Sequence, residues 1–149
     1  MKIYKVLGLD PAKKTGWAYW DGDWVVGVFD PYDTKKLVRA IGELWCLGIH
    51  HAFIEDCYLG AVGRNVATLK ALVRCQTRLV MALEHYEIPH TLIVPTVWQG
   101  YFKVRGKRPE RKQRAIEIAE PITGFKLTSD EADAVLIAEF GRVHHEEGK

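Results

Sequence analysis

Residues 5–30 read KVLGLDPAKKTGWAYWDGDWVVGVFD, a stretch that combines an apolar strand, an acidic residue and a hairpin. The apolar side chains of residues 3–10 indicate a largely buried strand, which ends at Asp10 because Pro11 cannot continue a central strand. Residues 15–20 and 24–29 are aromatic and β-branched, and Asp21-Gly22 between them is typical of a type I′ hairpin turn. Residues 1–30 therefore predict a three-stranded antiparallel meander.

The rest of the chain alternates between helical and strand patterns. Apolar spacing predicts helices over about 34–47, 62–86 and 109–120, and a last helix from near Thr128 to the His144-His145 tail. Short apolar runs predict strands over 52–57 and 89–94. The order β-β-β-α-β-α-β-α-α predicts an α/β fold with a mixed five-stranded sheet and helices on its faces. Without a repeat or a linker, residues 1–149 form a single predicted domain.

Composition excludes several classes of protein. A content of 48% hydrophobic and 27% charged residues is typical of a globular protein in water, and no apolar run is long enough for a membrane helix. Asp10 interrupts the start of the chain too early for a signal peptide, so no targeting segment is expected. Three cysteines without CxxC spacing argue against disulfides or a zinc site, and they favour a reducing, cytoplasmic location.

Positive charge is concentrated in one segment, although the net charge of the chain is only +2. Residues 103–114 hold seven basic residues and one acidic residue, a local charge of 7 − 1 = +6. Such a segment attracts polyanions, and phosphate contacts of this kind supply most non-specific affinity for nucleic acids. A solvated basic surface without a ligand explains the pattern equally well. The basic residues are Lys103, Arg105, Lys107, Arg108, Arg111, Lys112 and Arg114.

Two acidic residues close apolar strands. Asp10 ends the first strand, and Glu55 ends the apolar run of the strand predicted over 52–57. If these strands are parallel neighbours, their ends lie roughly 5 Å apart. Ligand sites in such sheets form outside the carboxyl ends of the strands. Taken singly, each of these acids is more often a turn or capping residue.

Two further acids open the last predicted helix. Thr128 and Glu131 have the spacing of a capping box, which places Asp130 and Asp133 in the first helical turn. At a spacing of i, i+3 these two carboxylates share one face of the helix. The simpler interpretation is that first-turn acids merely complement the helix dipole.

The four carboxylates together suggest a metal site. Without cations, each close pair would repel by roughly 4 kcal/mol at an effective dielectric constant near 20. All-oxygen ligands favour Mg²⁺ or Mn²⁺ over zinc, and a pair of such ions can catalyse in-line phosphodiester hydrolysis.

Four short motifs contain these acids and the residues around them. They are Gly8-Leu9-Asp10-Pro11, Thr15-Gly16-Trp17-Ala18, Ile54-Glu55 and Asp130-x-x-Asp133-Ala134. In order and spacing, over essentially the whole chain, they resemble the motifs of the RuvC family of Holliday junction resolvases, which are RNase H-like nucleases. The short length of the chain resembles a phage or small bacterial member.

The resemblance implies a homodimer, formed through the helix at 62–86, that makes paired nicks in four-way DNA junctions with two Mg²⁺ ions, for which Mn²⁺ could substitute. The branched DNA would be cut in the cytoplasm of a bacterium or of a phage-infected host. By position, the four metal-binding acids are Asp10, Glu55, Asp130 and Asp133.

Further DNA contacts follow from the same resemblance. Tyr58 occupies the position of an aromatic residue that stacks on junction bases, an interaction worth about 1–3 kcal/mol. Lys112 occupies a basic position near the scissile phosphate, where it could stabilise developing charge. The other expected DNA-binding residues are Lys103, Arg105, Lys107, Arg108 and Arg111.

The sequence departs from the family pattern at two places. Ala12 stands where many members have glycine, which predicts a different loop beside the metals. Trp98 does not match the expected bacterial pattern, so the preferred cleavage sequence stays open.

Functions other than that of a strict resolvase are also compatible with parts of the sequence. A broader debranching nuclease fits the sequence equally well, and a YqgF-like RNA-processing nuclease would keep the fold. An actin-like ATPase needs two domains and is excluded by length. A catalytically silent DNA-binding module is disfavoured because all four acids are present.

Overall fold

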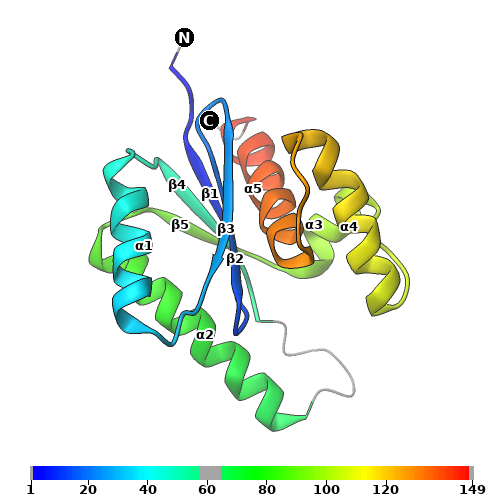
Figure 1. Ribbon diagram of the computed structural model, residues 1–149, viewed down its shortest axis with the longest axis horizontal. Helices are drawn as coiled ribbons and strands as arrows, with labels where there is room; N and C mark the ends of the chain where they lie inside the picture. The colour runs from blue at the N-terminus through cyan, green and yellow to red at the C-terminus, as the bar shows by residue number, and fades with distance from the viewer. Residues whose placement is uncertain (1, 58–64, 148–149) are drawn as a thin grey trace.

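A five-stranded sheet lies between two groups of helices (Figure 1). The computed structural model describes residues 2–57 and 65–147. The strands lie in the order β3-β2-β1-β4-β5; β2 is antiparallel to its neighbours β1 and β3, and β1, β4 and β5 are parallel. Their bounds are Val6–Asp10 for β1, Thr15–Trp20 for β2, Trp24–Phe29 for β3, His51–Glu55 for β4 and His90–Ile93 for β5.

The helices cover both faces of this sheet. Figure 1 shows α1 (Thr34–Cys46) and α2 (Val66–His85) on one face. The other face carries α3 (Pro95–Phe102), α4 (Arg108–Thr123) and α5 (Ser129–Glu147). Within the described residues, no helix has both the length and the apolar character that crossing a lipid bilayer requires.

The predicted α/β class and mixed five-stranded sheet are confirmed, but the predicted element order lacked one helix. Pro95 directly follows the strand predicted over 89–94 and suits the end of a strand, but in the structure it occupies the first turn of α3, where proline's missing N–H costs no helical hydrogen bond. The β2–β3 hairpin is present, but its turn is not type I′. Three residues separate Trp20 from Trp24, and in this loop positive φ is found at Gly22 alone.

Side chains of the central strands alternate between two hydrophobic cores. Leu7 and Leu9 of β1 face α1 and α2, whereas Val6 belongs to the core beneath α3, α4 and α5. Because strand side chains alternate, Asp10 points to the same face as Val6, toward α5. The same argument applied to β4 places Glu55 on the face of Phe53, which also packs beneath α5.

Helix α5 approaches the sheet unusually closely because glycines lie beneath it. A methyl group on Gly8 would overlap the carbonyl oxygen of Ala134, and one on Gly16 would overlap the carbonyl oxygen of Asp130. Farther along, Gly141 of α5 leaves no room between the helix and the ring of Phe53. These contacts set the height of α5 above β1 and β2 along most of its length.

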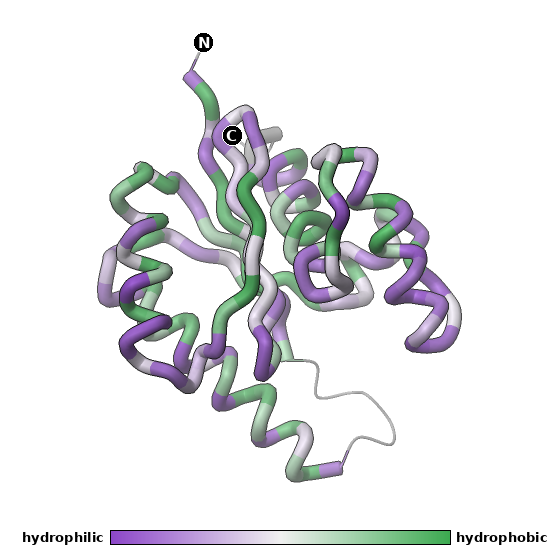
Figure 2. The backbone as a smooth tube through the Cα atoms, viewed as in Figure 1, coloured by the Kyte–Doolittle hydropathy of each residue, from purple (hydrophilic) through white to green (hydrophobic). Residues whose placement is uncertain are grey.

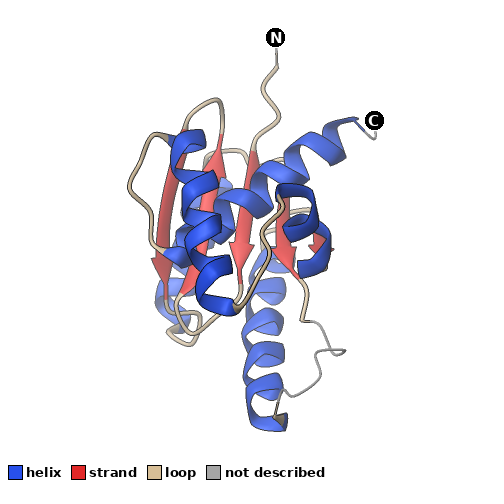
Figure 3. Ribbon diagram, turned by 90° about the vertical axis from the view of Figure 1, so that its right-hand side faces the viewer, coloured by secondary structure: helices blue, strands red, loops and turns tan. Residues whose placement is uncertain are grey.

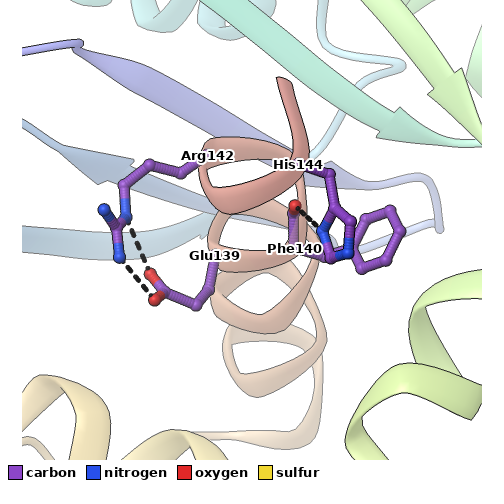
Figure 4. A network of polar contacts seen from close by, with 4 residues as sticks. All are labelled: Glu139, Phe140, Arg142 and His144. Carbon is purple, nitrogen blue, oxygen red and sulfur yellow. Dashed lines mark hydrogen bonds and ion pairs between the residues drawn. The ribbon is translucent and has the colours of Figure 1, made fainter. Parts of the chain in front are cut away.

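Polar contacts hold the second half of α5 in place. Arg142 donates two hydrogen bonds to the Glu139 carboxylate, at 3.1 and 2.6 Å (Figure 4). Its guanidinium also lies 4.5 Å from the ring centre of Trp20 in β2. On another side of the helix, the His144 ring stacks on Phe140 at a centroid distance of 4.0 Å. The first and the last of these contacts lie within α5, whereas the contact of Arg142 with Trp20 joins the C-terminal half of the helix to β2.

The close packing predicts that Gly16→Ala destabilises the protein. The added methyl group meets backbone rather than a movable side chain, and overpacking of this kind costs about 2 kcal/mol. Gly100→Ala in α3 is the matched control, since no atom lies within 4 Å of its added methyl group. Chemical denaturation should show a lower unfolding free energy for Gly16→Ala and an unchanged or higher one for Gly100→Ala. Equal stability of the two variants would contradict the packing.

Candidate active site

Asp10 and Glu55 lie side by side at one edge of the sheet. They are the last residues of β1 and β4, which are parallel neighbours with Leu9 paired to Ile54. Asp10 is buried, with 8% of its surface exposed, and Glu55 is half-buried. The expected parallel pairing, on which the joint position of these two acids depended, is therefore present.

The N-terminal part of α5 brings two more carboxylates to this edge. The Thr128 N–H donates to the Glu131 side chain at 2.9 Å, and the Glu131 N–H donates to the Thr128 hydroxyl at 3.2 Å. This reciprocal pair is the capping box expected from the sequence. It fixes the start of the helix, with Asp130 in the first turn; Asp133, predicted in the same turn, lies at the start of the second, and both acids are half-buried.

Electrostatics show that the four acids influence one another. Burial raises the pKa of Asp10 well above its ordinary value, and the charges of Glu55, Asp133 and Asp130 raise it further. Burial also raises the pKa of Asp133 to about 7, with additional repulsion from Glu55 and Asp130. Acids from β1, β4 and α5 therefore form one interacting cluster in the folded chain.

The basic segment divides into an inner and an outer part. Lys112 and Arg111 are half-buried in α4, and both lower the pKa of Asp133; Lys112 lowers that of Asp10 as well. These two residues, here called the inner basic pair, are the cations whose fields reach the acids. Figure 2 shows hydrophilic residues gathered around the start of α4. The exposed outer residues are Lys103, Arg105, Lys107, Arg108 and Arg114.

Acidic side chains lie among the outer basic residues, so this surface is not purely positive. Lys103, Arg105 and Arg114 line a hollow of about 570 Å³, which Glu110 and Glu117 also line. Arg114 lies 3.7 Å from the Glu117 carboxylate, so part of its charge is already balanced. The predicted stacking residue Tyr58 lies outside the described residues, and the structure does not test it.

Trp98 is a site residue that the sequence did not single out as functional. Its indole N–H donates to a Glu55 carboxylate oxygen at 2.8 Å, and the side chain is fully buried. The unpredicted helix α3 places it there, starting directly after β5 beside the end of β4. A tryptophan one turn past a strand end, with an N–H that needs a partner, was the available signal.

The loop after Asp10 and the exit of β4 are both tied to neighbouring elements. The Thr15 hydroxyl donates to the Ala12 carbonyl at 2.8 Å, and the Cys75 thiol of α2 donates to the same oxygen at 3.2 Å. Ala12 is not among the described non-glycine residues with positive φ, so alanine fits this loop without strain. Beyond Glu55, the Cys57 N–H donates to the Gln76 side chain of α2 at 2.7 Å.

The donor set fits hard divalent cations in its chemistry. Carboxylate oxygens are the ligands that Mg²⁺ prefers, and a cation would relieve the repulsion that raises the pKa values of Asp10 and Asp133. Within the described part of the chain, however, no three acidic, histidine or cysteine side chains converge as closely as a metal ion requires. The acids thus lie within electrostatic reach of one another without forming a ready-made coordination shell.

Comparison with solved structures identifies the fold. The chain superimposes on Thermus thermophilus RuvC in complex with a Holliday junction substrate, with a TM-score of 0.71 and 14% identity, covering 97% of this chain and 96% of that one. It matches the fowlpox virus Holliday junction resolvase with a TM-score of 0.62 and 12% identity, over 94% and 99% of the two chains. No family model and no curated protein matches the sequence. The fold is therefore the one shared by these resolvases.

The raised pKa of Asp133 predicts that its charge destabilises the metal-free fold. The folded state holds the proton up to about pH 7, whereas the unfolded chain releases it near pH 4, so stability falls as pH rises through this window. Asp133→Asn removes that effect and should raise the unfolding free energy at pH 8 by about 2 kcal/mol, after allowing for partial exposure.

Denaturation in EDTA at pH 4.5 and pH 8 measures this difference. The gain from Asp133→Asn should be present at pH 8 and nearly absent at pH 4.5. Glu43→Gln on exposed α1 is the matched control and should change stability little at either pH. A loss of stability at pH 8 in Asp133→Asn would show that the ionised carboxylate is favourably paired in the fold.

Proposed function

We propose that this protein is a magnesium-dependent endodeoxyribonuclease that resolves four-way DNA junctions by paired nicks. One observation carries the proposal: acids from β1, β4 and α5 form a repelling cluster beside Lys112, on a fold shared with a RuvC structure that holds a Holliday junction substrate. Buried carboxylates that raise one another's pKa are costly to a fold, and perturbed groups of this kind gather at functional sites.

The proposed ligands are Asp10, Glu55, Asp130 and Asp133. These residues would hold two Mg²⁺ ions, or Mn²⁺ in their place, which would supply Lewis-acid chemistry for hydrolysis of a phosphodiester to 5′-phosphate and 3′-hydroxyl ends. Asp10 is the most deeply buried of the four, with 8% of its surface exposed, so it defines the floor of the site. Glu55 borders the site from β4, and the two α5 acids close it from above the sheet.

The inner basic pair gives the site its affinity for the scissile phosphate. Lys112 acts on both Asp10 and Asp133, so an ammonium group is available where negative charge grows during phosphodiester cleavage. The exposed residues Lys103, Arg105, Lys107 and Arg108 bind DNA backbone farther out, with an affinity that declines as salt rises. Tyr58 completes the proposal as the residue that stacks on unpaired junction bases.

Helix α2 is the proposed dimer element. Its buried face consists of Cys75, Leu79, Ala82 and Leu83. Other apolar side chains stay exposed on this helix, with 67% of Val66, 43% of Val73 and 63% of Met81 accessible. Figure 3 shows α2 extending past the carboxyl ends of the parallel strands, the edge where Asp10 lies. A second copy paired along α2 would present two active sites to opposing strands of one junction.

Asp10→Asn should separate binding from cutting. The substitution removes a proposed metal ligand without altering the basic surface, so cleavage of a four-way junction should fall by roughly 100-fold or more. Junction affinity, measured by gel shift in EDTA, should stay within about twofold, since phosphate contacts supply most of it.

Asp23→Asn in the exposed β2–β3 loop makes the same chemical change away from the site and should cut as the wild type does. Near wild-type cleavage by Asp10→Asn would overturn the site assignment. A parallel loss of junction binding and cleavage would assign Asp10 to folding rather than to catalysis.

A further inference from the structure

Trp98 couples the hydrophobic core to the acid cluster through one hydrogen bond. Its ring is fully buried in the core beneath α3, α4 and α5, and its Nε1–H donates to the Oε2 atom of Glu55 at 2.8 Å. Nothing in the core requires that this N–H meet a carboxylate, because any backbone carbonyl would satisfy it. A bond to an ionised acceptor is about twice as strong as a neutral one, and it also directs the acceptor.

The geometry of α3 makes this contact rigid. Pro95 in the first turn starts the helix immediately after β5, which is the parallel neighbour of β4. Register pairs Glu55 with Ile93, so the strand end that carries Glu55 and the strand end that leads to Trp98 lie side by side. The indole is held by packing on all sides, whereas Glu55 has a flexible side chain that is only half-buried. The rigid partner therefore sets the rotamer of the flexible one.

We propose that Trp98 is a positioning residue that orients the Glu55 carboxylate for divalent cations. This inference rests on the proposed function, because it assigns Trp98 a role toward the same metal site. Binding Oε2 restricts rotation about the last side-chain bonds of Glu55, so the carboxylate meets an incoming cation in one orientation. The entropy of ordering Glu55 is then lost on folding rather than on metal binding. Partners of this kind typically contribute 10- to 100-fold to metal affinity.

Trp98→Phe removes the N–H while keeping an aromatic ring in the core. The variant should bind Mn²⁺ about tenfold more weakly than the wild type, as measured on DNA-free protein by electron paramagnetic resonance titration. Trp45→Phe on α1 is the matched control. Trp45 is 50% exposed and lies in the other layer of helices, so this variant should bind Mn²⁺ with the affinity of the wild type. Junction cleavage by Trp98→Phe should recover toward the wild-type rate as Mg²⁺ is raised.

Glu55→Gln tests whether the effect passes through Glu55. Metal affinity should be reduced in Glu55→Gln, and adding Trp98→Phe to it should reduce it little further, because the two changes disrupt one unit. Additive losses would show that Trp98 acts on the metal site by another route and would overturn the proposal.

NMR of protein that retains Trp98 tests the proposal even if Trp98→Phe does not fold. The five tryptophans give separate indole N–H signals in a nitrogen-15 NMR spectrum. A signal that moves both on Mg²⁺ addition and in Glu55→Gln is expected for Trp98. If no indole signal responds to either change, Trp98 does not position Glu55.

The results also separate this inference from the proposed function. If the wild type binds Mn²⁺, and Asp10→Asn weakens this binding while Trp98→Phe does not, the metal site stands and Trp98 is a core residue only. If Mn²⁺ binds Asp10→Asn and wild type equally, the proposed metal site itself is wrong.

Discussion

The contact between α5 and the glycines of β1 and β2 is the constraint on which the rest of the site depends. Side chains at Gly8 or Gly16 would overlap the backbone of α5, so the helix rests directly on the sheet. Because α5 lies so close to the sheet, Asp130 and Asp133 come near Asp10. Without them, Asp10 would be a single acid at a strand end. Because Arg142 and Phe53 hold the far half of α5, the first turn is placed by the whole helix and not by its cap alone.

Burial and charge oppose each other at this edge of the sheet. Four carboxylates gather where three elements meet, and two of them have raised pKa values because water is excluded and like charges are near. The inner basic pair offsets part of the repulsion. Trp98 gives Glu55 a directed partner, and Gln76 holds the backbone two residues beyond it. A fold that keeps such a cluster loses stability when the site is empty of cations, which accords with the proposed use of divalent ions.

The strands and the convergence of the four acids could be predicted from sequence because the residues that decide them follow local patterns, whereas the role of the acids as metal ligands stays a prediction. Apolar alternation marked the strands, Pro11 ended β1 after Asp10, and the Thr128–Glu131 pair marked the start of α5. Helix α3 could not be predicted in the same way, since Pro95 suits both the end of a strand and the start of a helix. The contact of Trp98 with Glu55 follows from that helix and was missed with it. The glycine contacts likewise depend on tertiary packing, which no local pattern reveals.

Cleavage of a panel of end-labelled DNAs tests whether this protein resolves four-way junctions. The panel holds a four-way junction, a three-way junction, a flap and a linear duplex, each incubated with Mg²⁺ or with EDTA. We expect paired, symmetrical nicks in the four-way junction that require Mg²⁺. Equal cutting of every branched substrate would instead identify a general debranching nuclease. Failure to cut any of these DNAs, together with Mg²⁺-dependent cleavage of structured RNA, would contradict the proposal that the protein is a DNA junction resolvase.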